Sequence, residues 1–275
     1  EYFQSRPDYQ YLYHTYSVIS AIYLKQERYS DSVKVMDEFI ARYPSSKDLP
    51  KAQLKIVTAW QTSGFSNNLF NSIERFYTKY NLDNQYWNDH EDKEIKNLIG
   101  QSIREYALLM SEHFHARYQK NRTEENFSAA SRWYTRYLNH YESYARKDKI
   151  YFKYAELLRQ KKYEKEALKF YELAAYDGDL VLDKKSSYLT ITLTNKLYRD
   201  SASRNKNIYL DKHIKYANLF AELYPTDNRL SSVIANAADI AYRDNRFDDT
   251  VKLTGHLNNV DETNEGNKYG VADVH

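Results

Sequence analysis

The 275-residue chain contains no cysteine and few of the residues that interrupt helices. The absence of cysteine excludes disulfide bonds, thiol catalysis and zinc sites built on cysteine. Six glycines and four prolines do not supply the frequent tight turns that an all-β protein needs. The sequence therefore predicts helices joined by short connections.

Long apolar runs and an excess of one charge are also lacking. No apolar run reaches the length of a membrane-spanning helix, and 42% hydrophobic with 28% charged residues is the composition of a folded protein. The formal net charge is +2, and like charges do not cluster, whereas a nucleic-acid-binding protein usually carries a basic patch. The sequence predicts no transmembrane segment and no nucleic-acid partner.

One short pattern recurs along the chain. From Tyr29 to Pro44, apolar residues follow at steps of three and four, as on the buried face of an amphipathic helix, and Pro44 ends that helix. Residues 210–225 repeat the pattern without a gap and also end in Tyr-Pro. Further copies begin at Ser66 and Phe127, and looser copies begin at Tyr163 and Phe247. The recurrence predicts a repeat protein rather than two unrelated domains.

Another helix precedes each copy, so the repeating unit is a pair of antiparallel helices. The first two copies lie 37 residues apart (66 − 29), which is one helical hairpin. The predicted pairs cover about residues 8–44, 47–80, 93–144, 148–177, 185–225 and 229–257. Residues 81–94 are polar and rich in turn formers, and they are predicted to be an inserted loop.

The repeat domain is predicted to span residues 6–257. Residues 1–5, Glu-Tyr-Phe-Gln-Ser, resemble the remnant of a protease site used to remove purification tags, and they are left out of the fold. The polar stretch 258–275 is predicted to be a loop or a frayed tail. Whether a signal peptide, a lipid anchor or further repeats belong to a longer chain stays open.

The helix pairs resemble tetratricopeptide repeats, whose 34-residue unit consists of two antiparallel helices. Counted back from Tyr29, Tyr16 falls at the family's first-helix aromatic position, Ser20 at its glycine and Tyr23 at its tyrosine, and Pro44 falls at its closing proline. The chain departs from the family in its longer units and in lacking the close-packing glycine. The resemblance implies an all-α, right-handed superhelix (an α-solenoid) of about six antiparallel helix pairs.

The Tyr-Pro endings and the 37-residue spacing are similar to repeats of bacterial cell-envelope proteins. One example is the lipoprotein component of the outer-membrane β-barrel assembly machinery. This similarity implies a periplasmic or envelope-associated protein, with a cytoplasmic location as the alternative. It identifies no particular partner.

The sequence predicts no catalytic residue, no cofactor-binding residue and no metal site. His113 and His115 are two residues apart and point in different directions on a helix, whereas metal-binding histidines lie at i and i+4. The acidic stretch 89–92 lacks the glycine and the spacing of a calcium loop. The glycines are isolated, which excludes a phosphate-binding loop. A non-enzymatic protein is therefore predicted.

Tyrosine is unusually frequent, with 29 residues against 11 phenylalanines and 3 tryptophans. A tyrosine ring can pack between helices while its hydroxyl reaches water or a carbonyl group. Packing between helices is the favoured interpretation, since aromatic residues at helical spacing are usually core residues. The alternative is an aromatic groove that binds a peptide or a sugar.

The implied superhelix has a concave surface, lined by the first helix of each pair and suited to an extended protein segment. The family's groove-facing positions fall on His14, Ser17, Lys25, Lys51, Thr58, Gln61, Glu112, His115, Gln119, Tyr151, Arg159, Asn195, Tyr198, Asp239, Tyr242 and Arg243. The predicted function is a non-enzymatic scaffold or adaptor that binds a protein or peptide partner there, in a bacterial envelope assembly. The alternative is a carbohydrate-binding module of an envelope polysaccharide system.

Overall fold

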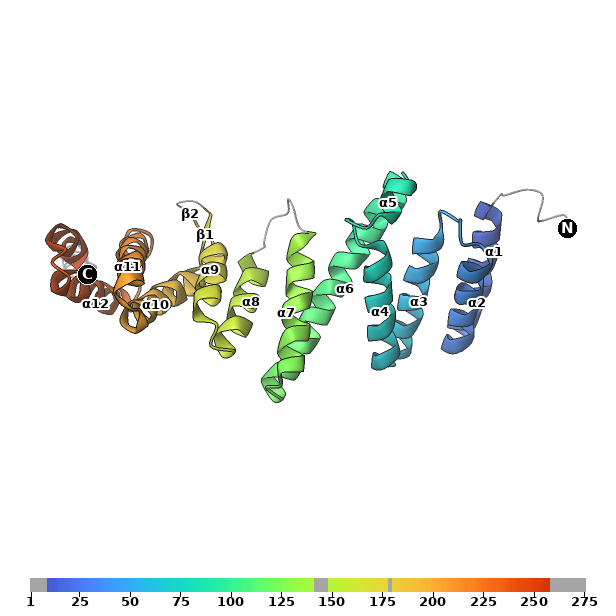
Figure 1. Ribbon diagram of the computed structural model, residues 1–275, viewed down its shortest axis with the longest axis horizontal. Coiled ribbons are helices and arrows are strands. Elements are labelled where there is room, and N and C mark those ends of the chain that lie inside the picture. Colours follow the sequence, from blue (N-terminus) through green and yellow to red (C-terminus); the bar gives the residue numbers. More distant parts are fainter. Residues whose placement is uncertain (1–8, 141–147, 178–179, 258–275) are drawn as a thin grey trace, which may run out of the picture. The chain divides into compact units, whose positions relative to one another are not determined.

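The computed structural model describes residues 9–140, 148–177 and 180–257, and nearly all of them are helical (Figure 1). They belong to two compact units, residues 1–143 and 144–275, which are described separately below. Within the described ranges, no helix combines the length and the apolar character needed to cross a bilayer. The predictions for residues 1–5 and 258–275 concern residues outside this description.

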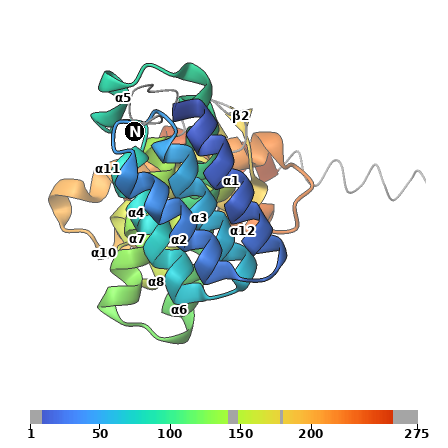
Figure 2. The same cartoon turned by 90° about the vertical axis from the view of Figure 1, so that its right-hand side faces the viewer.

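The first unit consists of successive helix pairs. Its elements are α1 (Tyr9–Lys25), α2 (Tyr29–Arg42), α3 (Leu49–Ser63), α4 (Ser66–Tyr80), α5 (Tyr86–Asp89), α6 (Lys93–Lys120) and α7 (Glu124–Asn139). The pairs are α1/α2, α3/α4 and α6/α7, and α2 also packs against α3 of the next pair (Figures 1 and 2). This is the stacking of a tetratricopeptide-like array.

The second unit continues the same plan. Its elements are α8 (Asp148–Gln160), α9 (Glu164–Ala175), β1 (Tyr176–Asp177), β2 (Leu180–Val181), α10 (Lys184–Asp200), α11 (Ser203–Leu223) and α12 (Leu230–Arg243), and residues 247–257 are helical as well. The strands β1 and β2 form a small antiparallel ladder that places Tyr176 opposite Val181. The sequence pattern did not predict this ladder, which connects α9 to α10.

The recurring sequence pattern lies on the buried face of the second helix of each pair. Met36 and Phe39 of α2 are completely buried, and so are Ala217 and Phe220 at the equivalent positions of α11. The equivalent residues of α4 and α7 are Ile73, Phe76, Tyr134 and Tyr137, and they are buried too. The prediction of an all-α protein built from tetratricopeptide-like helix pairs is thus confirmed.

Serine takes the place of the family's glycine where α1 and α2 approach each other. Ser20 of α1 is buried, and its Oγ lies 2.8 Å from Oγ and 3.1 Å from the carbonyl oxygen of Ser32 in α2. Two small side chains allow this close approach and also satisfy each other's polar atoms. Around them, the rings of Tyr13 and Tyr16 pack on Phe39 with centroid distances of 5.6 and 5.5 Å.

The segment predicted to be an inserted loop, residues 81–94, contains the short helix α5. Trp87 of α5 is buried, and its Nε1 donates hydrogen bonds to the carbonyl oxygens of Tyr80 and Asn81. Asp92 then caps α6 by accepting a hydrogen bond from the backbone N–H of Ile95. The loop prediction is corrected accordingly: one aromatic anchor holds the insertion against the end of α4.

The helix α11 starts earlier than the repeat predicts. The pattern places the start of this second helix near residue 209, but α11 begins at Ser203, and α10 ends at Asp200. Ala202 has extended backbone angles and marks the break between the two helices. Residues 203–209 contain neither glycine nor proline, so nothing in them prevents the helix from starting there.

Candidate functional site

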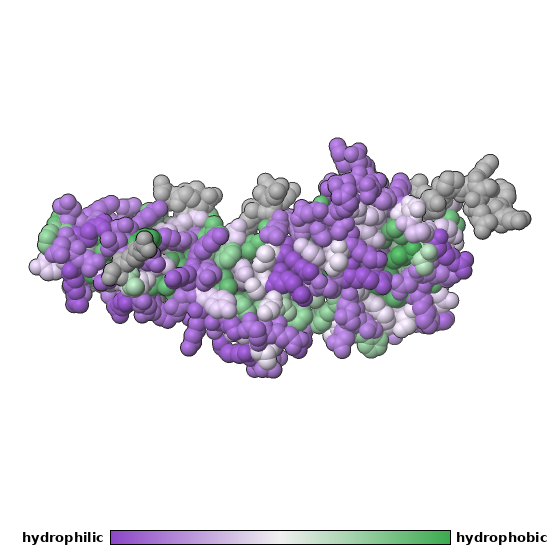
Figure 3. Space-filling model, viewed as in Figure 1, coloured by the Kyte–Doolittle hydropathy of each residue, from purple (hydrophilic) through white to green (hydrophobic). Residues whose placement is uncertain are grey.

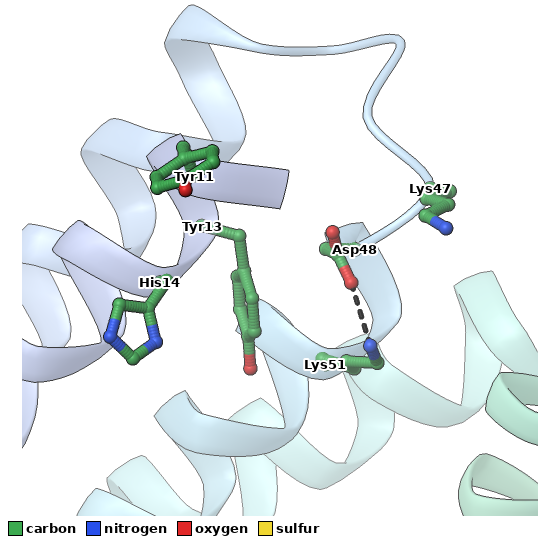
Figure 4. A pocket seen from close by; sticks show the side chains of 6 residues that line it. All are labelled: Tyr11, Tyr13, His14, Lys47, Asp48 and Lys51. Atoms are coloured by element: carbon green, nitrogen blue, oxygen red, sulfur yellow. Dashed lines mark ion pairs between the residues drawn. The ribbon is translucent and has the colours of Figure 1, made fainter. Parts of the chain in front are cut away.

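Two adjoining pockets lie between the first helices of the pairs in the first unit. The polar pocket is lined by Tyr11, Tyr13, His14, Lys47, Asp48 and Lys51 (Figure 4). The apolar pocket is lined by Tyr13, Ser20, Ala21, Leu24, Ser32, Lys51, Leu54, Lys55, Thr58 and Leu98. They share the side chains of Tyr13 and Lys51 and together form a groove along α1, α3 and α6.

The polar pocket has a volume of about 480 Å³. Figure 4 shows Tyr11, Tyr13 and His14, all on α1, along one wall and the charged side chains at the start of α3 along the other. Tyr11 is 77% exposed, so its ring is open to a ligand. One wall therefore offers aromatic surface, and the facing wall offers ionic groups.

Asp48 is the buried centre of the charged wall, because its side chain is only 2% exposed. Its Oδ1 lies 2.8 Å from Nζ of Lys51, whereas its Oδ2 receives no hydrogen bond from the described residues. Lys47 lies further out, 3.9 Å from Oδ2 of Asp92. Burial, together with the negative charge of Asp48, raises the pKa of Tyr13 to about 12, so the phenol stays protonated.

The apolar pocket has a volume of about 250 Å³. Its apolar walls come from Leu24 of α1, Leu54 of α3 and Leu98 of α6, and Leu98 is 44% exposed. Thr58 and the lysine side chains of α3 form its polar rim. The pocket therefore matches an apolar side chain whose backbone remains near polar groups.

Three of the predicted groove residues line these pockets, namely His14, Lys51 and Thr58. Ser17 and Lys25 lie on α1, and Gln61 lies on α3, where its Oε1 accepts a hydrogen bond from the hydroxyl of Tyr106. Further along the unit, Glu112 and Gln119 are exposed on α6. These two side chains line neither pocket.

Two predicted groove residues lie in the interior instead, and their placement is corrected. His115 is 8% exposed, and its Nδ1 lies 3.0 Å from the hydroxyl of Tyr134 in α7. Tyr198 is also 8% exposed, and its hydroxyl donates a hydrogen bond of 2.9 Å to Asp244. His115 thus faces α7, the partner helix of its repeat, whereas the hydroxyl of Tyr198 faces the end of α12 in the next pair.

The remaining predicted residues lie in the second unit and contact neighbouring side chains there. Arg159 donates hydrogen bonds to Glu156 and to Tyr171, and Asn195 donates one to Asn236. The other four are Tyr151, which packs near Phe170, Tyr242, which packs near Phe247, and the ion pair of Asp239 with Arg243. None of these side chains lines either of the two pockets described for the second unit, around Asp211 and Arg246 and around Asp148 and Phe152.

The sequence analysis did not identify four important residues of the groove, namely Tyr11, Tyr13, Asp48 and Leu98. For Asp48 a signal existed, because an aspartate just before Leu49-Pro50 marks the start of a helix. For Tyr11 and Leu98 the signal was an apolar residue on the face of an amphipathic helix that faces away from the core.

The comparisons with known proteins add little to this description. No protein-family model and no curated protein sequence matches the chain. The solved structures that match include Pseudomonas aeruginosa pilF, at 17% sequence identity over 81% of this chain and 96% of that chain, with a TM-score of 0.29. A TM-score this low supports no conclusion, so the fold assignment rests on the helix pairs and their buried repeat positions.

Proposed function

We propose that this protein is a non-enzymatic scaffold that binds an extended segment of a protein partner in the groove along α1, α3 and α6. The apolar pocket is the observation that supports the proposal. It is formed by leucines from three separate helices, and Leu98 remains 44% exposed at its edge. A partner's apolar side chain would remove this surface from water, at roughly 25 cal/mol per Å² of buried apolar area.

The rim of the pocket suits the backbone of such a segment. Lys55 and Thr58 follow one another along α3 beside the leucines, and Lys55 can donate hydrogen bonds to carbonyl oxygens or to an acidic side chain. A pocket for one anchor side chain, surrounded by polar groups, is the usual form of an energetically important contact at a protein interface.

We further propose that the partner belongs to a bacterial envelope assembly and that the protein is periplasmic or envelope-associated. The support is the similarity of the Tyr-Pro repeat endings and of their 37-residue spacing (66 − 29) to repeats of envelope proteins. A non-enzymatic role agrees with a sequence in which no nucleophile, metal-binding or phosphate-binding motif was found.

Site-specific photo-crosslinking in the source cells tests the proposal. A photoreactive amino acid at Thr58, which is exposed at the groove, is expected to crosslink one protein through one segment, identified by mass spectrometry. The matched control is the same amino acid at Lys79, which is exposed on α4 and lines neither pocket. The Leu98→Glu variant is expected to abolish the crosslink, because it places a charge in the apolar pocket.

Identical crosslinks from positions 58 and 79, or an unchanged crosslink in the Leu98→Glu variant, would refute a groove-bound partner. His115 and Tyr198 are unsuitable positions for this test because both are buried, and their replacement would disturb the helix packing itself.

A further inference from the structure

The buried carboxylate of Asp48 in the polar pocket has one oxygen without a partner. Oδ1 forms an ion pair with Nζ of Lys51, whereas Oδ2 receives no hydrogen bond from the described residues. The side chain of Asp48 makes no capping hydrogen bond to α3 either, although this residue occupies the N-cap position. A buried acceptor of this kind is unfavourable unless a donor reaches it, so a ligand with a hydrogen-bond donor would be stabilised at this oxygen.

The charges of the polar pocket balance one another. Lys51 is paired with Asp48 at 2.8 Å, and Lys47 has Asp92 at 3.9 Å. Asp92 lies just outside the lining of the pocket, and with it each lysine has an acidic partner, so these pairs leave no strong excess charge that would favour an anionic or a cationic ligand. The lysines can still donate hydrogen bonds, and Asp48 can still accept one, so the pocket suits a neutral ligand that both donates and accepts.

Tyr11 adds an apolar surface of defined shape. Its ring lies on the wall of the pocket (Figure 4) and is 77% exposed, more than any other large hydrophobic side chain among the described residues. The face of an aromatic ring carries a partial negative charge, which complements the C–H groups that line one face of a sugar ring. The hydroxyl groups around the edge of a sugar are at once donors and acceptors.

We propose that the polar pocket binds a neutral carbohydrate, with one sugar ring on Tyr11 and a sugar hydroxyl donating a hydrogen bond to Asp48. Lys47 and Lys51 then donate hydrogen bonds to other sugar oxygens. The volume of about 480 Å³ lies within the range of roughly 300–1,000 Å³ that is usual for small-ligand sites. This site is the polar part of the groove, next to the apolar pocket that is proposed to hold the partner's anchor side chain, and its evidence does not depend on the apolar pocket.

Binding can be measured with the whole chain on an array of neutral oligosaccharides built from glucose, galactose and N-acetylglucosamine, followed by isothermal titration calorimetry of the oligosaccharides that bind. The Asp48→Asn variant is expected to raise Kd roughly tenfold or more, since a hydrogen bond to a charged group contributes about that much. The Tyr11→Ala variant is also expected to raise Kd roughly tenfold, because it removes the aromatic surface on which the sugar ring packs. The matched control is Tyr242→Ala, an exposed tyrosine (61% exposed) of the second unit, and it should leave Kd unchanged.

Circular dichroism of each variant shows whether the fold is kept, and Leu98→Glu separates the two sites. This variant is expected to lose the protein crosslink and to keep sugar binding, whereas Tyr11→Ala is expected to do the opposite. The proposal is overturned if no neutral oligosaccharide binds at millimolar concentration, or if Tyr11→Ala binds as the wild type does. The proposal is also overturned if the acidic peptide hexaglutamate binds at the pocket and no neutral sugar competes with it, since the ligand would then be an anion.

Discussion

Each unit buries a histidine between helices, but the two rings have different surroundings. In the first unit, Nε2 of His140 lies 2.8 Å from the hydroxyl of Tyr77, and its Nδ1 lies 3.7 Å from the exposed carboxylate of Asp83. In the second unit, Nδ1 of His213 lies 3.2 Å from the carbonyl oxygen of Ile191, and its Nε2 has no partner among the described residues.

This difference shows how the surroundings of a buried polar group set its charge state. Burial lowers the pKa of both histidines, because a charged ring is poorly solvated inside the protein. At His140 the negative charge of Asp83 opposes the effect. At His213 the Ile191 carbonyl group and the nearby Asn236 side chain oppose it only in part, the positive charge of Arg199 adds to it, and the pKa falls to about 4.

The hydrophobic cores of the two units, by contrast, should respond alike. Phe39 of α2 and Phe220 of α11 occupy the same position in the repeat, and both are completely buried. We expect Phe39→Ala and Phe220→Ala each to lower the free energy of unfolding by about 3–5 kcal/mol, through lost apolar burial and a new cavity. Hydrogen exchange measured by mass spectrometry should show the loss of protection in α1–α3 and in α10–α12, respectively.

The control for this pair is Phe247→Ala, since Phe247 is 54% exposed and its replacement should change stability far less. A small effect at one of the two buried positions would mean that the units do not share equivalent cores.

The pH dependence of stability should distinguish the units. An unfolded histidine has a pKa of about 6.5, and His213 has one of about 4 when folded. Because the unfolded chain takes up the proton first, the contribution of His213 to stability is complete above pH 6.5. It is lost as the pH falls toward 4. The difference of about 2.5 pKa units corresponds to about 3 kcal/mol.

Urea denaturation of the wild type and of His213→Gln at several pH values between 7.5 and 4 measures this contribution. Glutamine keeps polar atoms in place of the ring but does not titrate, so the variant should lose about 3 kcal/mol less than the wild type over this range. Parallel curves for the two proteins would show that His213 is not the group responsible.

A smaller change is expected in the pKa of His140 in the first unit. Replacement of Asp83 by Asn removes the negative charge beside His140, so the pKa of His140 should fall further and its surroundings should resemble those of His213 more closely. NMR titration of the ring protons measures this pKa directly. The control is Asp37→Asn, which instead affects an ion pair with Arg75, and there the pKa of His140 should not change.

The smallest effects are expected at two exposed ion pairs with the same spacing. Arg42 pairs with Glu38 in the first unit at 2.6 Å, and Arg243 pairs with Asp239 in the second at 3.0 Å. All four side chains are at least half exposed, so Arg42→Ala and Arg243→Ala should each change stability by less than about 0.5 kcal/mol. A larger change in urea denaturation at either site would reveal a role beyond the surface pair.

Local sequence patterns were sufficient to predict the helix pairs. The spacing of three and four residues sets which face of a helix is apolar, and the prolines at positions 44 and 225 end α2 and α11 through their own backbone chemistry. These effects act within a few residues of the chain.

Which residues line the groove depends on tertiary packing instead. Successive residues along a helix are rotated by about 100° about its axis. A small shift in register therefore moves a residue from the groove into the core, as with His115 on the 28-residue helix α6. Tyr11 and Asp48 belong to different helix pairs and line one pocket only because α1 and α3 pack side by side. Helical periodicity is a local property of the chain, whereas such a pocket depends on how separate helices are rotated and stacked.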